Sequence, residues 1–252
     1  MGRWSRPLAE SLVRWLGAPD GRHWLDVGTG TGALAAAICR VTNPASVVAC
    51  DPADAFVHLA SSQLQDPRVR FEVAGVGRLP ARPGGYDLVV SSLALNFVPD
   101  PTEAVQEQLS LLRMGGRIAA CVWDYAGGME FLRHFWDAVT SLDPKAAVHD
   151  EGARFPICTP DALGALFESC GARHVRTDEL RIPTVFRDFE DYWRPFVGGP
   201  GPAPGYVATL SPERCDDLVA DLKRRLPQQP DARIELSARA WVVVGNRGRG
   251  AI

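Results

Sequence analysis

The sequence of 252 residues lacks the features that mark several common classes of protein. It has no stretch of about 20 consecutive apolar residues, the length that a helix needs to span a bilayer. It has no long run of basic residues, and its formal net charge is −3. Because nucleic-acid binding draws on clustered lysine and arginine, nucleic acid is not an expected partner. Residues 1–17 also lack the apolar core and cleavage site of a signal peptide.

Patterns typical of disulfide frameworks and metal centres are missing as well. No two cysteines form a C-x-x-C pair, and the histidines show no metal-ligand spacing. We therefore expect free thiols, a cytoplasmic location and no metal. The cysteines stand at 39, 50, 121, 158, 170 and 215, and the histidines at 23, 58, 134, 149 and 174.

The composition is that of a globular chain with a sizeable core, since 46% of the residues are apolar and 23% are charged. The length fits one large domain or one domain with an inserted cap. Residues 8–16 place leucine, valine and tryptophan at helical spacing, which predicts an amphipathic helix near the N-terminus.

The most informative stretch is 23–34, HWLDVGTGTGAL. A β-like run from His23 to Val27 carries an acid, Asp26, at its end and opens into three alternating glycines, Gly28, Gly30 and Gly32, before an alanine-rich helical segment. Glycine allows a tight turn and lets a ligand approach the backbone. The start of the helix offers unpaired N–H groups. The stretch therefore predicts a small polar ligand at a strand-to-helix turn.

Two ligand classes compete for this turn. The dinucleotide fingerprint G-x-G-x-x-G needs its third glycine at position 33, which is alanine, and Gly32 is out of register. A carboxylate at Asp26 would repel a diphosphate and attract an ammonium group. The pattern Asp-x-Gly-x-Gly-x-Gly resembles motif I of the class I S-adenosylmethionine-dependent methyltransferases, whose glycine loop packs on the methionine and ribose of the ligand.

Further strands follow in the order that this family requires. Strands are predicted at 46–50, 69–73, 86–92 and 117–123, and a helix over 101–112 is expected to end at a C-cap formed by Gly115 and Gly116. Asp51 ends the second strand, where an acid can accept both ribose hydroxyls, as the family's acid does. The alternative is that Asp51 caps a helix beginning at Pro52.

The resemblance implies a set of cofactor-binding residues. Family members usually carry an acid near Gly75 that receives the adenine amino group, and this chain has none there. The backbone of Gly75 and Val76 is expected to hold the adenine instead. Ser91 is expected at the methionine end of the cofactor. The predicted cofactor-binding residues are Asp26, Gly28, Thr29, Gly30, Asp51, Pro52, Gly75, Val76 and Ser91.

The second half is expected to carry the substrate. Helices are predicted at 129–142, 159–170 and 211–226, and strands at 174–186 and 234–246. Residues 187–210 are rich in aromatics, glycine and proline. This insertion predicts a lid over an apolar or aromatic substrate, and a homodimer contact or ordinary surface packing is the alternative. The tail 247–252 is expected to fray.

Over the whole chain, the sequence is similar to the ubiquinone/menaquinone-biosynthesis-like branch of these methyltransferases. The resemblance implies an α/β, Rossmann-like fold with a seven-stranded mixed sheet, helices on both faces and an inserted substrate cap. It also implies one domain over 1–252. Its parts are an N-terminal helical segment (1–22), a cofactor-binding half (23–125), cap insertions (126–158 and 187–230) and the rest of the sheet domain (159–186 and 231–246).

The expected reaction is methyl transfer from S-adenosylmethionine to O, N or C of a small molecule, with S-adenosylhomocysteine as product. His134 and Tyr125 are candidate bases, and Asn96 is a candidate substrate contact or a loop-capping amide. Other base candidates are Asp124, Glu130 and Tyr192. The alternatives are a fold-retaining enzyme that catalyses a rearrangement or cyclisation, an NAD(P)-dependent oxidoreductase and a pure binding protein.

Overall fold

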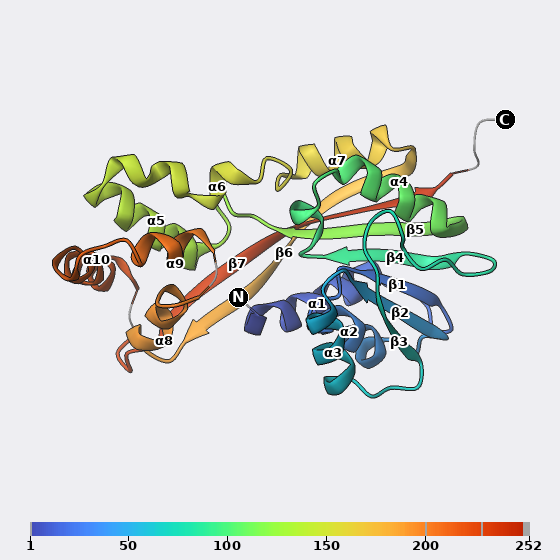
Figure 1. Ribbon diagram of the computed structural model, residues 1–252, viewed down its shortest axis with the longest axis horizontal. Helices are drawn as coiled ribbons and strands as arrows, with labels where there is room; N and C mark the ends of the chain where they lie inside the picture. Colours follow the sequence, from blue (N-terminus) through green and yellow to red (C-terminus); the bar gives the residue numbers. More distant parts are fainter. Residues whose placement is uncertain (1, 200, 228, 249–252) are drawn as a thin grey trace. The chain divides into compact units, whose positions relative to one another are not determined.

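A seven-stranded mixed sheet with strand order β3-β2-β1-β4-β5-β7-β6 organises the chain (Figure 1). The computed structural model describes residues 2–199, 201–227 and 229–248. The pairs β1–β2, β1–β4, β2–β3 and β4–β5 are parallel. The predicted Rossmann-like α/β fold is therefore confirmed. The strands are β1 (His23–Val27), β2 (Ser46–Asp51), β3 (Val69–Val73), β4 (Tyr86–Ser92), β5 (Leu112–Trp123), β6 (Ala172–Phe186) and β7 (Ile234–Arg247).

The register brings the carboxyl ends of the first strands to one edge of the sheet. Val27 pairs with Cys50, and Asp26 pairs with Val90. Asp51 pairs with Val73 at the end of β3. The loops that follow β1, β2, β3 and β4 consequently leave this edge together, which is where open α/β sheets bind their ligands.

The chain divides into two compact units. The sheet unit comprises Gly2–Val122, Thr159–Leu180 and the residues from Trp241 on. The helical unit comprises Trp123–Cys158 and Arg181–Ala240. It includes the two predicted cap insertions, 126–158 and 187–230. The tail residues 249–252 lie outside the described residues, and Arg247 is the last residue of β7.

Helices lie on both faces of the strands in the sheet unit (Figure 1). Leu8, Leu12 and Val13 of α1 are buried, as the helical spacing predicts, and α1 packs on α2. Trp15 is only half-buried, and its indole N–H donates to the Asp178 carboxylate (2.9 Å). The helices are α1 (Gly2–Leu16), α2 (Ala33–Val41) and α3 (Asp54–Gln63) on one face, and α4 (Pro101–Leu111) and α7 (Pro160–Ser169) on the other.

The junction between α4 and β5 differs from the prediction. The expected glycine C-cap is wrong, because α4 already ends at Leu111 and the segment that holds Gly115 and Gly116 belongs to β5. The pairing of β4 with β5 shifts register between Tyr86 and Leu88, and Gly115 has φ +70°. The start of β5 is thus irregular, and a bulge there needs a residue that tolerates positive φ, which glycine does.

The insertion 187–210 forms short helices within the helical unit. Residues 187–210 contain α8 (Phe189–Trp193), η3 (Arg194–Phe196) and α9 (Pro202–Val207); residue 200 lies outside the described residues. Prolines stand in the first turns of η3 and α9, where a missing N–H costs no hydrogen bond. The other helices of this unit are α5 (Glu130–Leu142), η2 (Pro144–His149), α6 (Glu151–Arg154) and α10 (Pro212–Arg225).

The aromatic residues of 187–210 form the core of the helical unit. Phe196 stacks on Phe135 of α5, with ring centroids 4.4 Å apart and planes 6° from parallel. Tyr192 is fully buried, and its hydroxyl donates to the Phe131 carbonyl (2.8 Å). The aromatic richness from which a lid was predicted is therefore explained by packing inside this unit. Within the described residues, no helix is long and apolar enough to span a bilayer.

Candidate functional site

A cleft of about 580 Å³ opens at the carboxyl edge of the sheet, and every residue that lines it belongs to the sheet unit. Binding pockets for small ligands commonly occupy about 300–1,000 Å³. The lining is mostly apolar, and its polar side chains are Asp51, Ser91 and Gln108. The lining residues are Val27, Gly28, Gly30, Asp51, Pro52, Phe56, Ala74, Gly75, Val76, Ser91, Leu93, Ala94, Leu95, Phe97, Val98, Pro99 and Gln108.

The glycine loop forms one wall of the cleft. The backbone N–H groups of Gly28 and Thr29 donate to the Cys50 carbonyl (2.9 Å each), which ties the loop to the end of β2. Gly28 has φ +76°, and a Cβ at this position would overlap the Cβ of Ala94. Glycine is therefore required here both by backbone conformation and by close approach.

Asp26 lies behind this wall and does not line the cleft. Its Oδ2 accepts hydrogen bonds from the Thr29 hydroxyl (2.7 Å) and the Ala35 backbone N–H (3.1 Å). Complete burial raises the pKa of Asp26 to about 7, although both hydrogen bonds act in the opposite direction. In this structure Asp26 and Thr29 connect the glycine loop to the first turn of α2, and a contact of either with the cofactor stays a prediction.

Asp51 lines the cleft and is held in place by the backbone. Its Oδ1 accepts from the Ala53 N–H (2.9 Å), and its Oδ2 accepts from the Gly30 N–H (3.0 Å). Only 8% of the residue is exposed. The alternative that Asp51 caps a helix is wrong, because Ala53 is the N-cap of α3. Each carboxylate oxygen keeps a lone pair for a further hydrogen bond.

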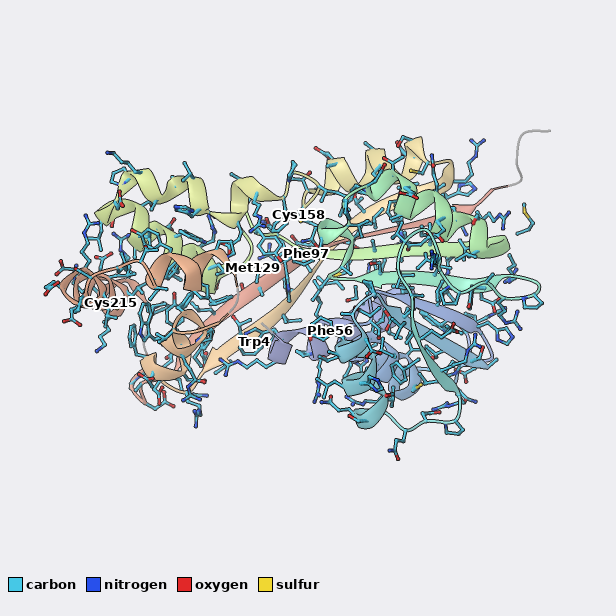
Figure 2. All side chains as sticks on the ribbon, viewed as in Figure 1. Trp4, Phe56, Phe97, Met129, Cys158 and Cys215 are labelled. Atoms are coloured by element: carbon cyan, nitrogen blue, oxygen red, sulfur yellow. The ribbon has the colours of Figure 1, made fainter. Side chains whose placement is uncertain are left out.

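The loops after β2 and β3 contact each other where they line the cleft. Gly75 packs against Pro52, since a Cβ at Gly75 would lie 3.1 Å from the Pro52 Cβ. Val76 follows Gly75 in the lining, and Phe56 of α3 lines the same cleft. Of Phe56, 48% is exposed, and it is labelled in Figure 2. This part of the lining offers apolar surface to a flat ligand group.

Ser91 and Asn96 come from β4 and the loop after it. Ser91 is buried and lines the cleft, whereas Asn96 is not among the lining residues. The Nδ2 of Asn96 is buried and has no hydrogen-bond partner among the described residues. Its neighbour Phe97, which Figure 2 labels, lines the cleft. Of Phe97, 63% is exposed. Phe56, Phe97 and Gln108 are lining residues that the sequence analysis missed.

The candidate bases His134 and Tyr125 belong to the helical unit. Burial lowers the pKa of His134, while Asp137 and Glu130 oppose this shift. Tyr125 is buried, with its ring centroid 5.0 Å from that of Phe155. A catalytic role for either residue stays a prediction.

Three other base candidates are engaged inside the helical unit. Asp124 forms an ion pair with Arg239 (2.6 Å), and the Glu130 carboxylate accepts from the Ser237 N–H (2.6 Å). The hydroxyl of Tyr192 is bonded to a backbone carbonyl, and burial raises its pKa. Each of these three side chains therefore has a structural partner within the helical unit.

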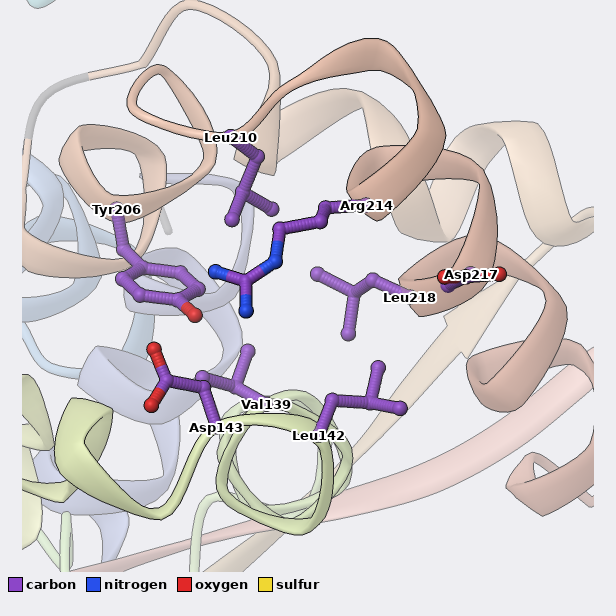
Figure 3. Close-up of a pocket in the computed structure, with 8 residues that line it drawn as sticks. All are labelled: Val139, Leu142, Asp143, Tyr206, Leu210, Arg214, Asp217 and Leu218. Atoms are coloured by element: carbon purple, nitrogen blue, oxygen red, sulfur yellow. The ribbon is translucent and has the colours of Figure 1, made fainter.

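A second, smaller cavity of about 160 Å³ lies between α5, α9 and α10 of the helical unit (Figure 3). Tyr206, Asp143 and Arg214 are its most prominent polar residues, and the guanidinium of Arg214 points toward the Tyr206 ring in Figure 3. Its volume is below the range of typical ligand pockets. The cleft of the sheet unit is therefore the better candidate site. The described residues contain no cluster of three or more metal-ligating side chains.

Comparison with known proteins agrees with the geometry. Residues 25–120 match the methyltransferase domain family. The chain is 34% identical to a demethylmenaquinone methyltransferase of Clavibacter sepedonicus over 102 residues, which is 40% of this chain and 41% of that protein. It is 28% identical to a trans-aconitate 2-methyltransferase of Deinococcus radiodurans over 164 residues, or 64% of this chain and 62% of that protein. These matches thus span less than two thirds of either relative.

Solved structures share the fold. The YcgJ protein of Bacillus subtilis superposes with a TM-score of 0.60 at 18% identity, covering 96% of this chain and 99% of that one. A Haemonchus contortus phosphoethanolamine N-methyltransferase was solved in complex with phosphomonomethylethanolamine and S-adenosylhomocysteine. It superposes with a TM-score of 0.57 at 15% identity, covering 98% of this chain and 53% of that one. Together with the matched segment, this likeness confirms the class I methyltransferase resemblance that motif I indicates.

Proposed function

We propose that this chain, whose residues 25–120 form a methyltransferase domain, binds S-adenosylmethionine in the sheet-unit cleft and methylates a small molecule. The observation that carries this proposal is Asp51, a buried carboxylate held by two backbone N–H groups in an otherwise apolar cleft beside the glycine loop. The two curated relatives named above are methyltransferases, which supports the same reaction.

Each wall of the cleft suits one part of this cofactor. The remaining lone pairs of Asp51 would accept the two ribose hydroxyls. Gly28 and Gly30 leave room for the ribose and methionine because neither carries a side chain. The apolar part of the cleft lined by Pro52, Gly75 and Val76, which we call the adenine slot, would take the adenine ring, and Ser91 would lie toward the methionine.

The sulfonium of the bound cofactor would supply an already activated methyl group. The chain then needs to hold the acceptor close to the methyl group and in line with it, and proximity accounts for much of such a rate enhancement. A base is required only where the acceptor atom carries a proton, and His134 and Tyr125 remain our candidates. Asn96 remains our candidate substrate contact. The exposed Phe97 in the lining favours an apolar or aromatic acceptor.

Calorimetric titration of the full chain with S-adenosylmethionine, S-adenosylhomocysteine and NADPH tests the proposal. We expect micromolar binding of the first two and none of NADPH. Binding of NADPH alone would favour the oxidoreductase alternative, and failure to bind any of the three would favour a scaffold. Binding without methyl transfer across a panel of aromatic acceptors would favour the rearrangement alternative. Cytoplasmic location, a homodimer and the absence of a nucleic-acid partner stay predictions.

A further inference from the structure

Gln108 is the polar side chain of the cleft for which the proposed function gives no role. It lies on α4, only 2% of it is exposed, and it lines the cleft. Its side chain makes no hydrogen bond to any described residue, and its amide atoms are not among the fully buried ones without a partner, so the small exposed part of Gln108 includes the amide. Buried amides in folded proteins are almost always hydrogen-bonded. An amide in the wall of a cleft without a protein partner is left to bond to water or to a ligand that displaces this water.

The neighbouring residue fixes α4 beside the loop after β3. The Glu107 carboxylate accepts hydrogen bonds from the backbone N–H groups of Gly77 (2.6 Å) and Leu79 (2.9 Å). In the same loop, Gly77 directly follows Gly75 and Val76, which line the slot that we assign to the adenine ring. Glu107 thereby anchors the helix that carries Gln108 to the segment that forms the adenine slot.

The rest of that slot offers no side chain for the edge of a base. Ala74, Gly75 and Val76 are apolar, and Pro52 has neither a side-chain donor nor an acceptor. The carboxylate of Asp51 is engaged with two backbone N–H groups and is assigned to the ribose. Gln108 is thus the one side chain of this lining that combines a hydrogen-bond donor with an acceptor in a single planar group.

We propose that the Gln108 amide recognises the adenine of the cofactor, an inference that rests on the proposed function. Its Oε1 accepts a hydrogen bond from the exocyclic amine, and its Nε2 donates to a ring nitrogen of the base. Glutamine makes this two-bond pairing with adenine in protein–nucleic acid complexes. The amide supplies the contact for which this chain has no acid near Gly75. Gln108 is a specificity-determining residue and takes no part in methyl transfer.

The test pairs a change in the protein with a change in the ligand. S-adenosylhomocysteine and its purine analogue without the exocyclic amine are titrated into the wild-type chain, Gln108→Leu, Gln108→Glu and Gln106→Leu. Leucine is close in size but cannot form hydrogen bonds, and glutamate keeps an acceptor for the amine. Gln106 is exposed on the same helix, so its variant is the matched control. For each variant, the affinity for S-adenosylhomocysteine is divided by the affinity for the analogue. Comparing this ratio between a variant and the wild-type chain isolates the contact between the side chain and the amine.

We expect the wild-type chain to prefer S-adenosylhomocysteine over the analogue about tenfold, as one lost hydrogen bond in a buried site implies. The preference should fall to about one in Gln108→Leu and persist in Gln108→Glu and Gln106→Leu. A preference that Gln108→Leu leaves intact, or equal weakening of both ligands, overturns the inference, because the amide would then be packing only. Should Gln108→Leu not fold, loss of the preference in Gln108→Glu overturns it. A wild-type chain that binds neither ligand overturns the proposed function as well.

Discussion

At the scale of single residues, Asp26 links the pH dependence of stability to the glycine loop. Its pKa is raised from an ordinary value near 4 to about 7 by burial. Between these values the folded chain keeps a proton that the unfolded chain has released. The free energy of unfolding should therefore fall as pH rises from about 4 to 7 and level off above it. Each pKa unit between the folded and the unfolded chain corresponds to about 1.4 kcal/mol of unfolding free energy.

The Asp26→Asn variant tests this linkage. Asparagine keeps an oxygen that can accept from Thr29 or Ala35 but does not titrate. We expect the downward slope that urea denaturation measures between pH 5 and 7 to be smaller in this variant. The slope should remain in Asp161→Asn, which changes an exposed carboxylate. An unchanged slope in Asp26→Asn would show that another group carries the pH dependence.

Asp51 should matter for affinity more than for stability. Replacing it with alanine removes the carboxylate that is assigned to the ribose hydroxyls, and hydrogen bonds to a charged group are each worth about 1.5–3 kcal/mol. We expect Asp51→Ala to weaken S-adenosylhomocysteine binding at least about tenfold. The chain should stay folded by circular dichroism. The variant Asp54→Ala changes an exposed carboxylate three residues away and serves as control. Unchanged affinity in Asp51→Ala would remove the ribose assignment.

At the scale of elements, the helices and strands that depend on neighbouring residues could be predicted from the sequence. Those that depend on contacts with distant residues could not. The bounds of β1, β3 and β4 match the prediction to the residue, because each is a short apolar or alternating run between clear breaks. The junction at Gly115 was mispredicted because a bulge against β4 depends on a partner distant in sequence. The helices of 187–210 were missed because the aromatic core that stabilises them brings α5 and α8 together.

The candidate site divides in the same way. The loop glycines and Asp51 stand at predictable strand ends and line the cleft. Asp26 has the same sequence signal, but its side chain turns toward α2, and only the hydrogen bonds to Thr29 and Ala35 reveal this. Gln108 gave no signal because a glutamine inside a helix is ordinary in sequence. Its burial beside the cleft is a property of the tertiary structure.

The glycine loop as an element should tolerate alanine unequally. Both Gly28 and Gly30 have positive φ, but only at Gly28 would a Cβ overlap another residue, Ala94. Gly30→Ala therefore carries the backbone strain alone, about 1–2 kcal/mol. Gly28→Ala should lose about 1–3 kcal/mol more through overpacking. Urea denaturation of the two variants measures the difference. Equal losses would mean that Ala94 moves aside freely.

At the scale of the whole molecule, each unit has a core of its own, and the proposed cofactor cleft lies within one of them. The cleft is lined by residues of the sheet unit alone. The aromatic core of the helical unit is centred on residues such as Phe131, Phe135 and Phe196. Damage to that core should therefore reduce stability without changing the affinity for the cofactor.

Phe196→Ala separates these two properties. Phe196 is 1% exposed and stacked on Phe135, so its truncation should cost about 3–5 kcal/mol of unfolding free energy. Val197→Ala, at a neighbouring residue that is 57% exposed, should change stability little. At a temperature where Phe196→Ala is still folded, it should bind S-adenosylhomocysteine as the wild-type chain does. A weaker affinity in Phe196→Ala alone would mean that the helical unit contributes to cofactor binding, because no residue of the cleft itself has changed.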